Sequence, residues 1–301
     1  MTEPNEDLVR QQAWTCTEPA ELEVAIDVGR VRIELNEDAT EVRVEVRHEP
    51  DADSPWEQGI TGLLNWLGTA TGDVAQDPGA AAVRAAEISW SETARRLVVR
   101  SAQDLPLRVV PLAVTVWAPA RSRLAVRTGA GDVTVTGRSG WAAVRTGSGN
   151  ARLDEVTGAL EVSTGSGRVE LGIVGAEAKL RTGSGGISAA ALSGPTTVKA
   201  GSGDVSFGEV HADLTLKTGS GDVEIADAFA GRFDLTAGSG SIRVGVHSGV
   251  AAELDLTSGS GHARSDLDVG RVAPADAPPL RVAGRTGSGD IRITRAATAA
   301  V

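Results

Sequence analysis

Residues 160–171 read Leu-Glu-Val-Ser-Thr-Gly-Ser-Gly-Arg-Val-Glu-Leu, and this stretch decides the fold of the chain. On both sides of the Gly-Ser-Gly step apolar and polar residues alternate, first at Leu160 and Val162 and then at Val169 and Leu171. Alternation with a period of two is typical of a β-strand with one buried face. The stretch therefore predicts two short strands joined by a tight corner.

The Gly-x-Gly corner recurs at a nearly constant spacing. Successive pairs begin 18 residues apart and are then followed by longer steps, at Gly129, Gly147, Gly165, Gly183, Gly201, Gly219, Gly238, Gly259 and Gly287. A fixed period of this length indicates a solenoid in which each repeat forms one coil. We therefore predict an all-β fold, a single-chain β-solenoid (β-helix) of coils of about 18 residues.

Stacked coils would lie about 4.8 Å apart and share one core. The period places equivalent apolar residues in one buried column at Val144, Val162, Leu180, Val198 and Leu216. A further apolar position recurs before a second turn, at Val156, Val174, Leu192 and Val210. At the corners we expect glycine to supply positive φ angles, and Thr or Ser hydroxyls to bond the corner amides.

The repeat also suggests how the chain is divided. We predict an N-terminal tail at 1–20, N-terminal coils at 21–127, regular repeats at 128–295 and a C-terminal tail at 296–301. Residues 50–95 interrupt the N-terminal coils as a helical and loop insertion, in which Ala80 to Glu87 is a candidate short helix. One elongated body is expected rather than two domains.

The insertion carries a candidate cap or partner surface of large apolar side chains, which are Trp56, Ile60, Leu63, Leu64, Trp66 and Leu67. All but Trp66 recur at helical spacing after a Ser-Pro start. We interpret this helix as a cap over the open strand edges at one end of the solenoid, with docking of a protein partner as the alternative. The flanking charges are acidic, which disfavours binding to a membrane surface.

Composition narrows the function classes. The chain has 29 basic and 40 acidic residues, and its net charge of -11 disfavours nucleic-acid binding. The single Cys16 excludes an internal disulfide. Residues 1–20 lack the pattern of a secretory signal, and no apolar stretch reaches the length of a membrane span. We expect a cytoplasmic protein, unless it leaves the cell by a route that needs no cleavable signal.

Basic residues recur directly before the corners, at Arg127, Arg145, Arg181, Lys199 and Lys217. The alternation predicts that these side chains point outward in one row. Such a row is a candidate surface for a polyanion or for the acidic face of a partner. Acidic residues at other outward positions leave an ordinary mixed surface as the alternative.

No catalytic, cofactor-binding or metal site is predicted. The residue after each corner varies too widely for a Ca²⁺ ladder, and the stacked Asp204 and Asp222 are expected to be solvated. The corners lack the third glycine of a dinucleotide-binding turn. We interpret the four histidines, His48, His211, His247 and His262, as scattered over different coil positions, and therefore predict a protein that is not an enzyme and has no cofactor.

The strand at Leu112 to Pro119, the Gly-Ala-Gly corner at Gly129 and the tandem Thr-Gly-Ser-Gly coils together resemble a bacterial β-strand-repeat family of unknown function that carries the label "putative adhesin". The segments from Gly249 to Leu256 and from Gly287 to Ile291 are similar to the closing part of cytoplasmic actinobacterial members. The resemblance implies a β-solenoid with no established activity.

These observations predict a non-enzymatic scaffold or adhesin-like protein-interaction molecule whose partner is unidentified. The alternative is self-association, in which molecules stack end to end as in bactofilin-like filaments. The open ends of a stack of β-coils favour this alternative.

Overall fold

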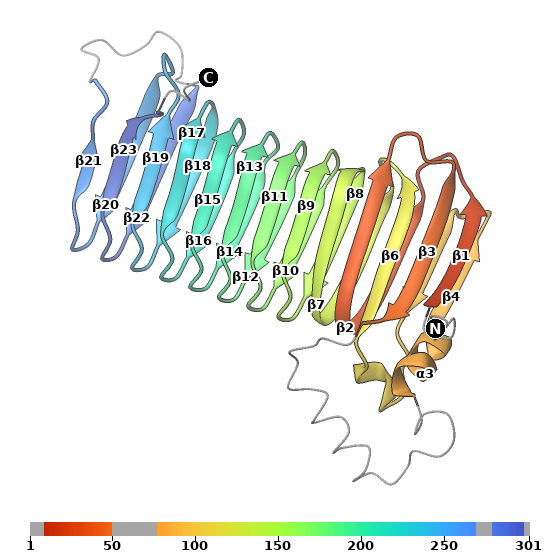
Figure 1. The fold of residues 1–301 in the computed structure, drawn as a ribbon. Helices are drawn as coiled ribbons and strands as arrows, with labels where there is room; N and C mark the ends of the chain where they lie inside the picture. The colour runs from red at the N-terminus through yellow and green to blue at the C-terminus, as the bar shows by residue number, and fades with distance from the viewer. Residues whose placement is uncertain (1–8, 50–76, 269–278, 298–301) are drawn as a thin grey trace. The chain divides into compact units, whose positions relative to one another are not determined.

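The computed structural model describes residues 9–49, 77–268 and 279–297 (Figure 1). The chain forms two compact units, residues 1–150 and residues 151–301. Unit 2 is built from parallel β-strands over an aliphatic core, as the period predicted, whereas unit 1 combines parallel and antiparallel strands. No helix of the described ranges is long and apolar enough to cross a membrane.

Unit 1 contains eight of the described strands, a short helix and one 3₁₀ turn. Their bounds are β1 Val9–Thr15, β2 Glu21–Asn36, β3 Glu41–His48, α3 Pro78–Ala85, β4 Glu87–Ser91, β5 Arg96–Arg100, η2 Leu107–Val109, β6 Leu112–Pro119, β7 Arg123–Ser139 and β8 Trp141–Thr146. The strands predicted at Arg96 to Ser101 and Leu112 to Trp117 are confirmed as β5 and β6.

Two long parallel strands, β2 and β7, connect the two sheets of unit 1. The first halves of β2 and β7 belong to a sheet with the strand order β4-β5-β2-β7-β8. Their second halves belong to a sheet with the strand order β1-β3-β6-β2-β7. Both strands pass from one sheet to the other where Gly29 of β2 pairs with Gly131 of β7. Gly29 has a φ of 123°, a conformation that favours glycine over residues with a Cβ.

Antiparallel strands finish the sheets of unit 1. Strand β3 runs antiparallel to β6, β1 antiparallel to β3, and β4 antiparallel to β5. Trp14 of β1 stacks on Trp90 of β4, with ring centroids 5.6 Å apart. These two outer strands, one from each sheet, are thus joined by aromatic contact.

The short helix expected at Ala80 to Glu87 is confirmed as α3. Asp77 is its N-cap, since its carboxylate accepts the backbone N–H of Ala80 at 2.9 Å, and Pro78 occupies the first turn. Arg10 of β1 donates to the carbonyl of Ala86 at 2.6 Å, just past the helix. The other helical prediction, with Trp56, Ile60, Leu63, Leu64, Trp66 and Leu67, lies outside the described residues.

Strand β1 occupies part of the stretch predicted as an N-terminal tail. It pairs along its length with β3, from Val9 opposite Arg47 to Thr15 opposite Glu41. Its side chains are mostly polar, and none is fully buried. Strand β1 therefore lacks the alternation of apolar residues that identifies the other strands. Its register is set by its backbone pairing with β3.

Unit 2 consists of coils that each contribute two short strands. Their bounds are β9 Ala151–Val156, β10 Leu160–Thr164, β11 Val169–Val174, β12 Ala178–Thr182, β13 Ile187–Leu192, β14 Thr196–Ala200, β15 Val205–Val210, β16 Leu214–Thr218, β17 Val223–Ala228, β18 Gly231–Ala237, β19 Ile242–Val246, β20 Ala252–Ser258, β21 Ala263–Ser265, β22 Leu280–Thr286 and β23 Ile291–Arg295.

The predicted core columns are confirmed within unit 2. Val162 pairs with Leu180, Leu180 with Val198 and Val198 with Leu216, and all four are at most 1% exposed. The second-turn column is equally buried at Val156, Val174, Leu192 and Val210. Parallel pairing in register thus produces one continuous aliphatic core along the unit.

The last coils do not stack in chain order. Strands β22 and β23 lie between β18–β19 and β20–β21, so that Gly231 pairs with Leu280 and Ala252 pairs with Leu280 on its other side (Figure 1). The coil of β20 and β21 is therefore the outermost described coil. Its apolar side chains, such as Leu254 and Leu256, are only half-buried because no further described coil covers them.

The corner threonines bond the corner amides, as predicted. The Thr182 hydroxyl accepts the N–H of Gly185 at 3.0 Å, and Thr218 accepts the N–H of Gly221 at 3.2 Å. The same bond recurs at Thr146, Thr164, Ser258 and Thr286. These threonines are buried, so each hydroxyl satisfies a donor that water cannot easily reach.

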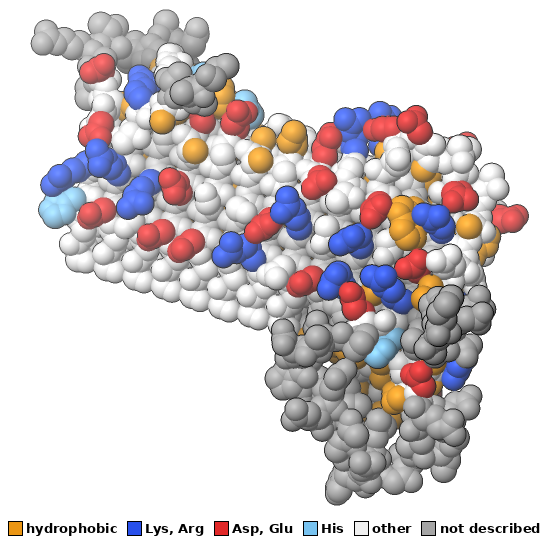
Figure 2. Space-filling view, viewed as in Figure 1, with side chains coloured by type: hydrophobic (Ala, Val, Ile, Leu, Met, Phe, Trp, Pro, Cys, Tyr) orange, Lys and Arg blue, Asp and Glu red, His pale blue; other side chains and the backbone are white. Residues whose placement is uncertain are grey.

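The reason predicted for the corner glycines was wrong. Positive φ among described glycines occurs at Gly29, Gly137, Gly231 and Gly249, which are not in the Gly-Ser-Gly corners. The corners need glycine because adjacent coils approach closely there. A Cβ on Gly185 would overlap the carbonyl oxygen of Gly167 in the preceding coil. These corners follow the lower margin of unit 2 in Figure 1 and form a largely white band in Figure 2.

Candidate interaction surfaces

The predicted basic residues occupy exposed positions in both units. In unit 1, Arg127 of β7 pairs in register with Arg145 of β8. In unit 2, Arg181 of β12 pairs with Lys199 of β14, and Lys199 pairs with Lys217 of β16. The period thus brings like charges side by side on adjacent parallel strands.

Strands β12, β14 and β16 form what we call the basic face. They carry four cationic side chains, Lys179, Arg181, Lys199 and Lys217, and no acidic residue. This face also holds all three lysines of the chain. Acidic residues appear on the strands to either side, at Glu161 of β10 and Asp234 of β18.

Only one of the four cations has an acidic partner within the described ranges. Lys179 donates to Glu177 at 2.8 Å, and this hydrogen bond raises the pKa of Lys179. Arg181, Lys199 and Lys217 have no carboxylate within ion-pair distance among the described residues. Because like charges in register repel one another, this row is less favourable than a row of mixed charges.

The opposite sheet shows the mixed surface that was the alternative. Arg152 of β9 lies 3.5 Å from Glu170 of β11, and Arg292 of β23 donates to Asp266 at 2.8 Å. Figure 2 shows acidic and basic side chains interspersed on the visible face. Acidic and basic side chains form ion pairs on this sheet, so part of their charge cancels.

Asp204 and Asp222 are stacked neighbours as expected, but their carboxylates do more than face water. Asp204 accepts the backbone N–H of Asp222 at 2.9 Å, and Asp222 accepts that of Ser241 at 2.8 Å. Asp290 accepts the N–H of His262 in the same way, and this bond lowers the pKa of Asp290. The recurrent Asp therefore fixes the stacking of one coil on the next.

The interpretation of the histidines as scattered was wrong for two of them. His211, Phe229 and His247 occupy the same position in successive coils, each directly after a buried strand end. Their rings stack, with centroids 4.2 Å apart from His211 to Phe229 and 3.9 Å apart from Phe229 to His247. We call these three stacked rings the ring ladder. The 18-residue step from His211 to Phe229 and again to His247 is the sequence signal that indicates it.

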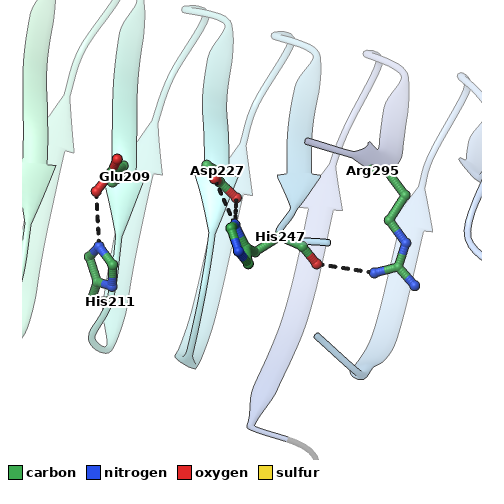
Figure 3. A network of polar contacts seen from close by, with 5 residues as sticks. All are labelled: Glu209, His211, Asp227, His247 and Arg295. Atoms are coloured by element: carbon green, nitrogen blue, oxygen red, sulfur yellow. Dashed lines mark hydrogen bonds and ion pairs between the residues drawn. The ribbon is translucent and has the colours of Figure 1, made fainter. Parts of the chain in front are cut away.

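The histidine ring at each end of the ring ladder lies next to a carboxylate (Figure 3). Nε2 of His211 lies 3.2 Å from Glu209, and Nδ1 of His247 lies 2.9 Å from Asp227. Arg295 donates to the carbonyl of His247 at 3.2 Å. No group of three or more metal-ligating side chains occurs among the described residues, and the ladder holds no nucleophile beside a base. Its contacts tie neighbouring coils together.

The fold and these surfaces define a β-solenoid that displays charged side chains at a fixed spacing. The model of the Toastrack DUF4097 family matches residues 112–269 and 195–300, and the chain belongs to this family. No curated protein matches the chain.

Among the solved structures that are similar to this chain, three are each described as a "putative adhesin". That from Bacteroides fragilis is 12% identical, with 95% of this chain and 96% of that chain covered and a TM-score of 0.41. That from Parabacteroides distasonis is 13% identical, with 95% and 96% covered and a TM-score of 0.40. That from Parabacteroides merdae is 11% identical, with 96% and 97% covered and a TM-score of 0.38.

Proposed function

We propose that this protein is a non-enzymatic scaffold that binds an acidic protein partner through the basic face. The observation that carries the proposal is the row Arg181, Lys199 and Lys217, in register on adjacent strands of a chain with a net charge of -11. A cluster of one sign on a chain of the opposite sign is expected where a complementary surface docks.

The rigidity of the solenoid supports this proposal. Because the strands lie about 4.8 Å apart, the cationic groups are held at a fixed spacing rather than on a mobile loop. The core side chains beneath them, Leu180, Val198 and Leu216, are at most 1% exposed. Binding an acidic surface therefore requires little ordering of the backbone, and relief of the repulsion within the row adds to the affinity.

The test is binding of the full chain to fluorescent polyglutamate, measured by anisotropy over a range of NaCl concentrations. A triple variant Arg181→Gln, Lys199→Gln, Lys217→Gln removes the row. The matched control, Arg232→Gln, Arg243→Gln, Arg292→Gln, changes the net charge by the same amount elsewhere in unit 2. We expect the first variant to lose about tenfold or more in affinity and most of the salt dependence. Equal losses in both variants would contradict the proposal.

Self-assembly is a second candidate function, and the edge of the outermost coil favours it. Within the described ranges β20 pairs only with β22, and β21 pairs only with β23. The free backbone groups of β20 can pair with a strand of another molecule, and half-buried Leu254 and Leu256 can be covered by it.

Light scattering coupled to size-exclusion chromatography distinguishes the two candidates. Growth of the molecular mass with concentration, abolished by Leu256→Lys but not by Asp255→Lys on the outward side of the same strand, would support assembly through β20. A constant monomer mass over a hundredfold range of concentration would remove this candidate and leave the scaffold proposal intact. The expected cytoplasmic location stays a prediction.

A further inference from the structure

Unit 1 contains a cleft of about 480 Å³ next to the 3₁₀ turn η2. Its floor consists of small or apolar residues, including Ala25, Ile26 and Gly129. Its walls carry three arginines and a few neutral polar groups, which are Arg100, Arg108, Arg127, Ser101, Gln103 and Thr128. Asp27 is the only acidic residue in the described lining. The volume is within the range of pockets that hold small molecules.

The strand register explains why the cleft exists. Ala25 of β2 lies opposite Arg100 of β5 on one side and opposite Arg127 of β7 on the other. The two arginines are therefore two strand spacings apart, about 9.6 Å between backbones. The methyl group of Ala25 leaves the space between them open. A larger side chain at this position would fill the gap.

Two of the arginines are oriented by carboxylates, one by Glu23 outside the lining and one by Asp27 within it. Arg100 donates to Glu23 at 2.7 Å, and Arg108 donates to Asp27 at 2.9 Å. Ser101 also donates to Asp27 at 3.3 Å, which fixes that carboxylate. A guanidinium has five N–H donors, so each arginine retains donors for a ligand. Arg127 has no ion-pair partner among the described residues.

The free donors and the charge of the cleft indicate the ligand class. Three guanidinium groups face two carboxylates, Asp27 in the lining and Glu23 beside Arg100, so the cleft has an excess of one positive charge. A phosphomonoester carries about 1.5 to 2 negative charges at neutral pH and has several strong acceptor oxygens. Arginine forks bind such oxygens through paired, charge-assisted hydrogen bonds. The neutral amide donor of Gln103 suits the polar remainder of a small molecule.

We propose that this cleft binds a small phosphate-bearing molecule, with its phosphate between Arg100 and Arg127 above Ala25. Arg108 contacts the phosphate from the side of η2. The site lies wholly within unit 1 and is independent of the basic face of unit 2. It gives the scaffold a small-molecule ligand in addition to its proposed protein partner.

Titration calorimetry of the full chain tests the proposal with three probes, glycerol 3-phosphate, inorganic phosphate and glycerol. We expect both phosphates to bind and glycerol not to bind. Tighter binding of the ester would identify a phosphomonoester ligand, and equal binding would identify free phosphate as the source of the same chemistry. Heat changes that NaCl at matched ionic strength reproduces would overturn the proposal.

Two pairs of variants locate the site. Arg127→Gln should weaken phosphate binding by about tenfold or more, whereas Arg145→Gln, on the next strand and outside the cleft, should not. Ala25→Ile should fill the floor and abolish binding, whereas Ala125→Ile, half-exposed on β7 and outside the lining, should not. Thermal unfolding of each variant verifies the fold. Unchanged affinity in folded Arg127→Gln and Ala25→Ile proteins would overturn the assignment.

Discussion

The backbone N–H of Gly185 donates a hydrogen bond of 3.0 Å to the side-chain oxygen of Thr182, inside the corner between β12 and β13. Thr182 is 7% exposed, so this bond is largely shielded from water. The sequence motif Thr-Gly-Ser-Gly is thus a structural unit: the hydroxyl satisfies the third residue after it, and the glycines permit the next coil to approach.

Replacing Thr182 with Val should destabilise the protein. Valine has nearly the same shape and a high strand propensity, but it leaves the N–H of Gly185 without its partner. A buried donor left unsatisfied costs about 1–3 kcal/mol. Thermal or urea unfolding measures the change. Thr182→Ser keeps the hydroxyl and should lose much less, so equal losses for Val and Ser would contradict a role for this bond.

Adding the missing hydroxyl at Ala200 should stabilise the protein. Ala200 lies in the same column as Thr182 and pairs in register with Thr218 on β16, and both of these threonines bond their corners. Ala200→Thr should gain about 0.5–1.5 kcal/mol, the net contribution of a typical hydrogen bond. Ala200→Val is the matched control, since it adds similar volume without a donor or acceptor. If both variants shift the unfolding midpoint equally, packing rather than hydrogen bonding explains the gain.

The regular coils could be predicted from the sequence because each one repeats the same local signal. Alternating apolar residues set the buried face of Val162, Leu180 and Val198, and the 18-residue period aligned them. The role of the corner glycines could not be derived in this way. Positive φ is a property of one residue, whereas the close approach of Gly185 to Gly167 depends on the distance between two coils.

The order of the last coils and the ring ladder could not be predicted from the pattern of a single repeat. The chain places Gly259 before Gly287, yet Gly287 stacks on Gly238 and Gly259 on Gly287. Only the pairing partners of the strands reveal this exchange. The spacing of the corners hides the ladder, because it lengthens after Gly219, whereas His211, Phe229 and His247 keep an even step of 18 residues. In the arginine cleft, the contribution of Ala25 depends on which strands flank β2.

Replacing Gly185 with Ala should be strongly destabilising. The added methyl group would overlap the backbone oxygen of Gly167, and backbone atoms of a packed coil cannot move aside easily. Overpacking of this kind costs about 1–3 kcal/mol or more. Gly175→Ala is the control, because the nearest atom to its added Cβ is 3.5 Å away, an ordinary contact. Comparable unfolding midpoints for the two variants would show that the coils are not held this closely at the corner.

Glu23 should make the stability of the protein depend on acid pH. Hydrogen bonds from Arg100, and then from Arg96, lower the pKa of Glu23 below its ordinary value of 4.5. A lowered pKa in the folded state means that the unfolded chain binds the proton more readily. The stabilisation is therefore fully present above about pH 4.5 and is lost as the pH falls through the folded pKa. Melting temperatures measured between pH 7 and pH 3 should fall more steeply for the native chain than for Glu23→Gln.

The control variant Glu21→Gln changes a glutamate on the same strand. Glu21 lies 3.9 Å from Arg123 without these hydrogen bonds, so Glu21→Gln should keep the native slope. A Glu23→Gln protein with the full native slope would place the acid sensitivity in other carboxylates.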